Sequence, residues 1–413
     1  MIKKIFLAIA VLLLAVNTSL AQSNSAYTRF GIGDVEFSTS ARKIGIGQLA
    51  VSVIDDNSIS TLNPAAWYKF KGTRFSVDLS YAGLLISDKN TSSFYSETDF
   101  KGFSFGFPIS EDYGIGLATG LIPYSRVSYK AKEIVSGTES YTADYEGKGG
   151  LSQIFIGTSV LLPGEISIGA TLDYYFGNIS YKTDLNFVNQ TIFPSQIEKL
   201  YKSTGFGSTV GILTPDLISV FGIKGVVSNL RLGASVKIIP EMNTDTLLIT
   251  RSVTIEDTLF NNRTTMVVPQ RISAGLSFNL FSNYLLTMDY AFQPWSEYKL
   301  ANKTQNVLRD LHKISTGFEY KPGQILGASV WEQIIWRAGL SFEKTQYLIN
   351  NQGIDQFSIF GGFSFPLGLE NSIDIALQYS TRGTTDFGLL KEQIIKLNFG
   401  ISFGEIWFLR YDY

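Results

Sequence analysis

The feature that most constrains this chain is a two-residue alternation of apolar and polar side chains, which begins near residue 73 and continues to about residue 408. In "RISAGLSFNL" (residues 271–280) and "IIKLNFGISF" (residues 394–403), every second residue is apolar and those between are mostly polar or small. Because successive side chains of a strand point to opposite faces, each such segment predicts a β-strand with one apolar and one polar face.

The length of these segments distinguishes a membrane barrel from a soluble sandwich. Many run for 11 to 16 residues, whereas strands of soluble proteins usually have about 5–6. Their polar faces carry charges and glycines, which suits a hydrated lumen, and charged residues make up only 17% of the 413 residues. Aromatic residues gather near segment ends, as interfacial girdles do: Tyr81, Tyr124, Tyr290, Trp295, Trp407 and Phe408.

We therefore predict an all-β fold, a transmembrane antiparallel up-and-down β-barrel of about 14 strands. The predicted strands lie near 73–86, 99–108, 113–129, 146–161, 165–182, 203–213, 229–241, 268–280, 284–298, 310–322, 332–346, 354–366, 371–385 and 391–408. Closure is required because an open sheet edge in lipid leaves backbone groups unpaired. Short turns should alternate with longer polar loops at 183–202, 242–267 and 299–309, as in outer-membrane barrels. The connections at 214–228 and 323–331 fall on the periplasmic side of the predicted barrel, where turns are usually short, and are longer than expected there.

The N-terminal segment has the pattern of a secretory signal peptide. Lys3 and Lys4 precede an apolar run and then "SLA", so we expect a signal peptide over 1–21, cleaved after Ala21. The alternative is an uncleaved anchor helix, for which the run is short. The protein is expected to be exported.

Residues 22–72 do not follow the alternation. We predict that they form a plug, or hatch, inside the lumen, ahead of a barrel spanning 73–413. A fourteen-strand barrel leaves room for more than side chains. The alternative is a disordered tail, which apolar positions such as Phe30, Leu49 and Trp67 disfavour.

Composition excludes several function classes. The formal net charge is −2 with no Lys/Arg run, which argues against nucleic-acid binding. There are no cysteines, and His312 is the only histidine, so no thiol chemistry, metal site or hydrolase triad is expected. We expect neither a cofactor nor enzymatic activity. The glycine-rich "RFGIGD" and "GIGQLA" do not follow a strand of a βαβ unit, so they do not indicate a nucleotide site.

Several stretches, taken in order, resemble the FadL family of outer-membrane transporters of long-chain fatty acids and other hydrophobic compounds. They are "STLNPAAWYKF" (60–70), "GIGLATGLIPYSRVSYK" (114–130), "LRLGASVKI" (230–238), "DYAFQPWSEYKL" (289–300) and "WRAGLSFEK" (336–344). The resemblance implies a fourteen-strand barrel with an N-terminal hatch. It also implies capture of a hydrophobic ligand from outside and lateral exit through the wall near a kinked third strand.

Candidate ligand-binding residues lie on the polar sides of the strands. Arg231, Arg271 and Arg337 are candidates for holding a carboxylate, because a guanidinium can bind it bidentately. The alternative is salt bridges across a hydrated lumen. Trp295 and Tyr298 line an external groove in one interpretation and belong to the aromatic girdle in the other.

Candidate plug and gate residues are Asn63, Pro64, Trp67 and Pro123. Pro64 fixes its own φ and biases Asn63 toward an extended conformation, so this stretch is interpreted as the exit from the plug into the first strand. The alternative is a tight turn before a strand. Pro123 lies within a predicted strand and removes a ladder hydrogen bond, so it marks either a gap in the wall or a simple bulge.

The resulting hypothesis is a passive outer-membrane channel for long-chain fatty acids or other hydrophobic compounds, with lateral exit near the third strand. The alternative is a FadL-like barrel that serves as a docking or shuttle subunit of a secretion or surface-assembly system. Expected partners are a fatty-acid-like molecule, outer-membrane lipid and the barrel-assembly machinery. The expected location is the bacterial outer membrane. A sealed wall and a filled lumen would favour the docking role, whereas an apolar pocket beside the plug with a gap in the wall by Pro123 would favour transport.

Overall fold

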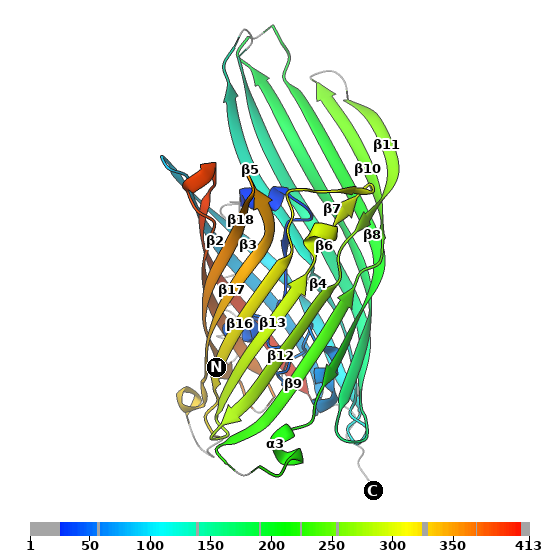
Figure 1. The fold of residues 1–413 in the computed structure, drawn as a ribbon, viewed down its shortest axis with the longest axis vertical. Coiled ribbons are helices and arrows are strands. Elements are labelled where there is room, and N and C mark those ends of the chain that lie inside the picture. The colour runs from blue at the N-terminus through cyan, green and yellow to red at the C-terminus, as the bar shows by residue number, and fades with distance from the viewer. Residues whose placement is uncertain are drawn as a thin grey trace.

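A closed antiparallel barrel forms the wall of the protein (Figure 1). The computed structural model describes residues 25–405, except 56–57, 138–139, 190, 224, 253–255, 324–328 and 369. The predicted signal peptide and the girdle candidates Trp407 and Phe408 lie outside the described residues. None of the helices among the described residues is long and apolar enough to cross a membrane.

Fourteen strands make up the wall, three of them as two consecutive segments: β4 with β5, β9 with β10, and β11 with β12. The wall segments are β2 (Thr73–Ser87), β3 (Ser92–Ser110), β4 (Ile115–Pro123), β5 (Ser125–Val135), β6 (Tyr141–Leu161), β7 (Ser167–Phe187), β8 (Ser195–Leu213), β9 (Val227–Ile238), β10 (Met242–Ser252), β11 (Glu256–Val267), β12 (Arg271–Leu280), β13 (Tyr284–Gln293), β16 (Leu311–Tyr320), β17 (Ile335–Ile349), β18 (Gln352–Pro366), β19 (Ser372–Arg382) and β20 (Lys391–Glu405). The last strand, β20, pairs with β2 along its full length and closes the barrel. The predicted fold class and strand number are confirmed.

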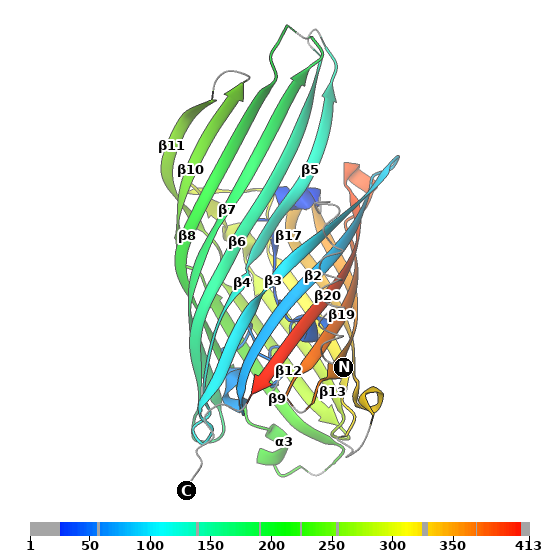
Figure 2. The same cartoon turned by 180° about the vertical axis from the view of Figure 1, so that it is seen from behind.

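Short elements lie between and inside these strands. The connections carry α3 (Leu217–Val220), η3 (Trp295–Glu297), β14 (Lys299–Leu300), β15 (Lys303–Thr304), η4 (Val330–Gln333) and η5 (Asp386–Gly388). The N-terminal part carries η1 (Ala26–Arg29), β1 (Asp34–Val35), α2 (Ala41–Gly45) and η2 (Pro64–Lys69), and it runs inside the barrel (Figures 1 and 2). We call its described residues, up to 72, the plug. The boundaries predicted at residues 21 and 72 stay predictions.

Side-chain exposure alternates in the sense expected of a barrel in lipid. Leu172 on β7 and Phe206 on β8 are 72% and 73% exposed, whereas Asp173 is 1% exposed. This is the reverse of a soluble protein, where exposed positions are polar. Because lipid, not water, surrounds such a wall, the apolar exterior and charged interior have one physical cause.

The wall is not of even height. The segments 125–150, 177–204 and 242–267 form a continuous sheet of β5, β6, β7, β8, β10 and β11, and it rises above the rest of the barrel (Figures 1 and 2). We call it the raised sheet, and the end of the barrel that bears it the outer end. The predictions of loops at 183–202 and 242–267 were wrong, since both segments are mostly strand. Beyond the bilayer no lipid demands an apolar face, so these strands lack the clean alternation that marks the others.

Candidate functional site

The plug leaves the lumen along the wall at the predicted Asn-Pro step. Asn63 is fully buried and caps η2: its side chain accepts a hydrogen bond from the Ala65 N–H (3.1 Å). Its amide nitrogen also donates to the carbonyls of Val51 in the plug (3.0 Å) and Ile212 in β8 (3.2 Å). Asn63 therefore joins two parts of the plug to the wall, and Pro64 occupies the first position of η2, where its missing N–H is not needed.

Trp67 completes this contact from the other side of η2. Its indole nitrogen donates to the Ser60 carbonyl (2.9 Å), and its ring stacks on Phe155 of β6, with 6.1 Å between centroids. The wall opposite η2 is smooth because it carries glycines. A Cβ added to Gly211 of β8 would lie 1.9 Å from the Asn63 carboxamide oxygen, so this position requires glycine.

Carboxylates of the wall bind the backbone of the plug deeper in the lumen. Asp289 of β13 accepts hydrogen bonds from the N–H groups of Ala50 (3.1 Å) and Val51 (2.8 Å). Asp78 of β2 accepts one from Ala41 (2.9 Å), at the start of α2. The plug is thus held by strands on different sides of the barrel.

Buried ion pairs add further attachments. Arg42 of the plug pairs with Asp55 and, at 3.5 Å, with Glu319 of β16. Arg337 of β17 pairs with the same Glu319 (2.7 Å) and with Asp374 (3.2 Å). These charges are all nearly inaccessible, and removing one member of such a network costs about 3–5 kcal/mol.

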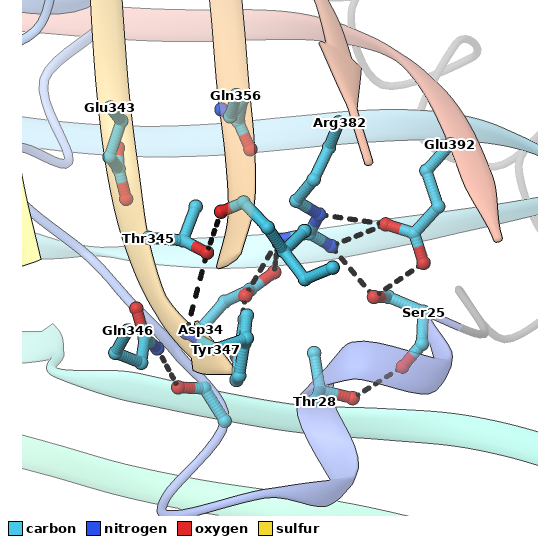
Figure 3. Close-up of polar contacts among 12 residues, drawn as sticks. Ser25, Thr28, Asp34, Glu343, Thr345, Gln346, Tyr347, Gln356, Arg382 and Glu392 are labelled. Atoms are coloured by element: carbon cyan, nitrogen blue, oxygen red, sulfur yellow. Dashed lines mark hydrogen bonds and ion pairs between the residues drawn. The ribbon is translucent and has the colours of Figure 1, made fainter. Parts of the chain in front are cut away.

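A second network fixes the outer end of the plug (Figure 3). Arg382 of β19 pairs with Asp34 of the plug (2.8 Å) and with Glu392 of β20 (2.6 Å), and donates to the Ser25 hydroxyl (2.7 Å). Tyr347 of β17 donates to the Asp34 carboxylate (2.8 Å). Sequence reasoning did not select these residues, because Arg382 and Glu392 lie at strand ends, where alternation gives little guidance.

The three arginines proposed for a ligand carboxylate lie in three separate environments. Arg337 belongs to the network described above, and Arg271 donates to the Glu36 carbonyl (3.1 Å) while its guanidinium lies 4.9 Å from the Phe37 ring centroid. Arg231 donates to the Tyr68 hydroxyl and the Thr214 carbonyl, each at 3.2 Å. Each arginine contacts groups of the protein, and the three do not converge on one pocket.

Trp295 and Tyr298 lie inside the barrel, so the alternative that placed them in the girdle was wrong, and their role in ligand binding stays a prediction. Both are 1% exposed, and their rings pack 5.6 Å apart. The chain turns inward after β13 at Pro294, and η3 carries both side chains over the lumen. Tyr124, another girdle candidate, is also buried, whereas Tyr290 is 42% exposed.

An outer cavity of about 420 Å³ lies beside Tyr298, above the plug. Its lining includes several aromatic side chains, with Tyr129, Tyr145, Tyr181 and Tyr201 from the raised sheet and Phe30 from the plug, together with aliphatic and polar residues. A separate cavity of about 340 Å³ near Arg231 opens at the inner end. The two cavities have no lining residue in common, and the plug lies between them.

The wall is interrupted at Pro123. From Phe103 onward β3 pairs with β4, which ends at Pro123, whereas β5 pairs with β6 and with β1 of the plug. Among the described strands, the part of β3 from Ser92 to Gly102 pairs with β2 alone. A gap therefore separates β3 from β5 at the outer end (Figure 2), and a cavity of about 530 Å³ lined by Pro123 lies there.

Charged side chains line the inner side of this gap. Arg126 of β5 pairs with Glu97 and Asp99 of β3, and Lys101 pairs with Glu36 of the plug (2.5 Å). Burial alone would raise the pKa of Glu36, but Lys101 and Lys396 lower it to about 2. An apolar molecule leaving the lumen here would pass between ionised groups.

The structure gives no indication of catalysis at His312. Its Nδ1 is hydrogen-bonded to the Tyr290 hydroxyl (2.8 Å), and its ring packs against Phe292. Within the described ranges, no group of three or more His, Asp or Glu side chains could hold a metal ion.

A family model described as BamG matches residues 1–413. No curated protein matches the sequence. Among solved structures, the toluene transporter TbuX of Ralstonia pickettii has 13% identity and a TM-score of 0.58, covering 90% of this chain and 99% of its own. A FadL homologue of Pseudomonas aeruginosa has 12% identity and a TM-score of 0.59, with 90% and 99% covered. The toluene transporter TodX of P. putida has 12% identity and a TM-score of 0.58, with 91% and 100% covered. At these identities the likeness establishes the fold, a FadL-type outer-membrane barrel, and confirms the expected resemblance at that level.

Proposed function

Because the chain belongs to the BamG family and has a FadL-type barrel, we propose that it is a docking subunit of an outer-membrane assembly system. The family's name points to barrel assembly, and the barrel-assembly machinery is the partner we propose. Fold alone does not determine function, so the proposal depends on the interior of the barrel.

The observation that carries the proposal is the filled lumen. Wall carboxylates of Asp78 and Asp289 bind the plug backbone, and ion pairs attach Arg42 and Asp34 to β16 and β19. Opening a path would break several of these contacts at once. A barrel whose interior is fixed in this way is better suited to presenting a surface than to passing molecules.

The test is recovery of the full-length, affinity-tagged protein from native outer membranes in mild detergent, followed by mass spectrometry. We expect subunits of the barrel-assembly machinery in near-equimolar amount, absent when an unrelated tagged barrel of similar abundance is purified. Recovery of the protein alone, with an equimolar hydrophobic compound bound, would overturn the docking role.

The second candidate is a channel for hydrophobic compounds with lateral exit at Pro123, and the gap between β3 and β5 favours it. The solved structures named above include toluene transporters, and several aromatic side chains line the outer cavity. The charges beside the gap weigh against it, since an apolar solute gains only about 0.8 kcal/mol per buried CH₂.

Pro123→Val tests this channel hypothesis. Valine restores the N–H that proline lacks, so a gate would narrow and uptake of a labelled fatty acid should fall severalfold. Uptake by Pro123→Val equal to that of the wild type would count against a channel. So would wild-type uptake no higher than that of a strain lacking the protein. Pro108→Val, at the inner end of β3, serves as the control for loss of a strand proline.

A further inference from the structure

The concave face of the raised sheet carries a row of tyrosines. Tyr129 of β5 and Tyr181 of β7 lie 6.3 Å apart, on either side of Gly147 of β6, and Tyr181 meets Tyr201 of β8 edge-on at 6.1 Å. A Cβ on Gly147 would lie 2.1 Å from the Tyr129 ring. The absence of a side chain at residue 147 therefore allows the rings to form one surface across four strands.

The opposite face of the same sheet is charged. Lys130 pairs with Glu146 (3.6 Å), and Arg251 pairs with Glu198 (2.6 Å). The raised sheet thus has a hydrophilic side turned away from the barrel axis and an aromatic side above the mouth. Tyr129 is 5% exposed, and Tyr181 and Tyr201 are partly buried against the same hydrophobic cluster. The accessible parts of these rings line the outer cavity, so a bound segment would contact them there.

The outer cavity lies at the base of this face and contains a polar group with no partner. Tyr298 is 1% exposed and lines the cavity, and its hydroxyl has no hydrogen-bond partner among the described residues. A buried hydroxyl without a hydrogen-bond partner is unfavourable. A bound group that offers an acceptor or donor would remove that cost.

The edge of β5 continues this surface toward the gap. The plug covers the start of that edge: β1 pairs with Ser125 and Arg126, and the Thr28 hydroxyl bonds the N–H and C=O of Ser128 (both 3.1 Å). Because alternate residues of a strand direct both backbone groups to the same edge, Lys130, Lys132 and Ile134 point theirs the same way. In the part of the chain that the structure describes, β5 beyond Ser128 pairs with β6 alone.

We propose that the open edge of β5 and the tyrosine face bind an extended segment of the partner protein, which adds a strand to the raised sheet. Only another backbone matches a row of N–H and C=O groups along a strand, which favours a polypeptide over a lipid. Its inward side chains lie beside Tyr129, and one enters the outer cavity. Lys130 and Lys132 at the edge discourage self-pairing. This inference rests on the docking function proposed above.

The first experiment removes the backbone donors of the edge and leaves the ladder to β6 intact. Lys130→Pro/Lys132→Pro removes two edge N–H groups together with both charges. Lys130→Ala/Lys132→Ala removes the same two charges but keeps the N–H groups. Recovery of the assembly machinery from native membranes should fall about tenfold or more for the proline variant and stay near the wild-type level for the alanine variant. Equal recovery with both would overturn the proposal. Heat-modifiable mobility on electrophoresis checks that each variant folds.

The second experiment uses the absence of cysteine in the chain. Thr183 lines the outer cavity, and Asp184 pairs with Lys182 (3.4 Å) on the other face. A membrane-impermeant maleimide should label Thr183→Cys in the isolated protein but not in the complex, and label Asp184→Cys in both. Equal labelling of Thr183→Cys in both states would refute the inference.

The outcomes separate the two proposals. If the wild-type protein recovers no assembly machinery, the docking function fails and the binding site fails with it. If the wild type and the two double variants of β5 recover the assembly machinery equally, the docking function stands and only the β5 site is wrong.

Discussion

At the scale of single residues, many of the contacts by which the wall holds the plug are made to the backbone of the plug. Asp78 and Asp289 accept hydrogen bonds from plug N–H groups, and Asn63 binds carbonyls of Val51 and Ile212. Such contacts fix the path of the plug without specifying its side chains. The identity of Asn63 therefore matters more than that of its neighbours.

Asn63→Ala should destabilise the folded barrel by about 2–4 kcal/mol, because it removes a helix cap and the hydrogen bonds to the Val51 and Ile212 carbonyls. The measurement is the temperature at which the fast-migrating folded form disappears on electrophoresis. Asn243→Ala, at an exposed position of β10, is the control and should leave that temperature unchanged. An equal effect of both variants would contradict the role of Asn63.

Glu36 makes the attachment of the plug depend on pH. Its pKa is about 2 in the folded protein and 4.5 when unperturbed, so the folded state favours the ionised form. The stabilisation is fully present above pH 4.5 and is lost as the pH falls toward 2; it amounts to roughly 3 kcal/mol at neutral pH.

Glu36→Gln should therefore lower the unfolding temperature at pH 7, and the difference from the wild type should disappear near pH 2. Glu256→Gln, whose side chain is 63% exposed, is the control. A difference between Glu36→Gln and wild type that is constant with pH would show that ionisation of Glu36 is not responsible.

At the scale of elements, the sequence predicts the wall strands well and the segments outside the bilayer poorly. Alternation marks β12 and β20 because lipid and lumen impose opposite demands on their two faces. Above the bilayer those demands end, so the outer parts of β8 and β11 resembled loops. For Trp295 and Tyr298 the sequence left both a groove and the girdle open, because it does not show that the chain turns inward at Pro294.

The packing of η2 against β8 gives a prediction at this scale. Gly211→Ala places a methyl group on the Asn63 carboxamide and should displace η2, which exposes the plug to limited proteolysis from the inner end. Gly361→Ala in β18 is the control, since nothing lies within 4 Å of a Cβ there. Equal resistance of both variants to the protease would mean that η2 can shift without releasing the plug.

At the scale of the whole molecule, the plug crosses the lumen and connects opposite parts of the wall. The sequence indicated a plug, since residues 22–72 contain apolar positions yet lack alternation, but it could not show which wall residues bind it. Contacts such as Asp34 with Arg382 join residues 348 positions apart, and no local pattern encodes them.

Arg382→Leu should destabilise the barrel by about 3–5 kcal/mol, because Glu392 remains buried without its cation. Arg263→Leu, at a position whose side chain is 93% exposed, should have no measurable effect. The unfolding temperature of the two variants decides the point, and a return toward the wild-type temperature in Arg382→Leu/Glu392→Gln would identify the unpaired carboxylate as the cause.

The network at Arg382 also sets an order of events during biogenesis. Ser25 directly precedes η1, yet its hydroxyl donates to Glu392 of β20, 367 residues later (2.8 Å). The same β20 closes the barrel against β2. The plug therefore cannot acquire its outer attachment until the last strand is in place, so the finished plug reports that insertion of the chain is complete.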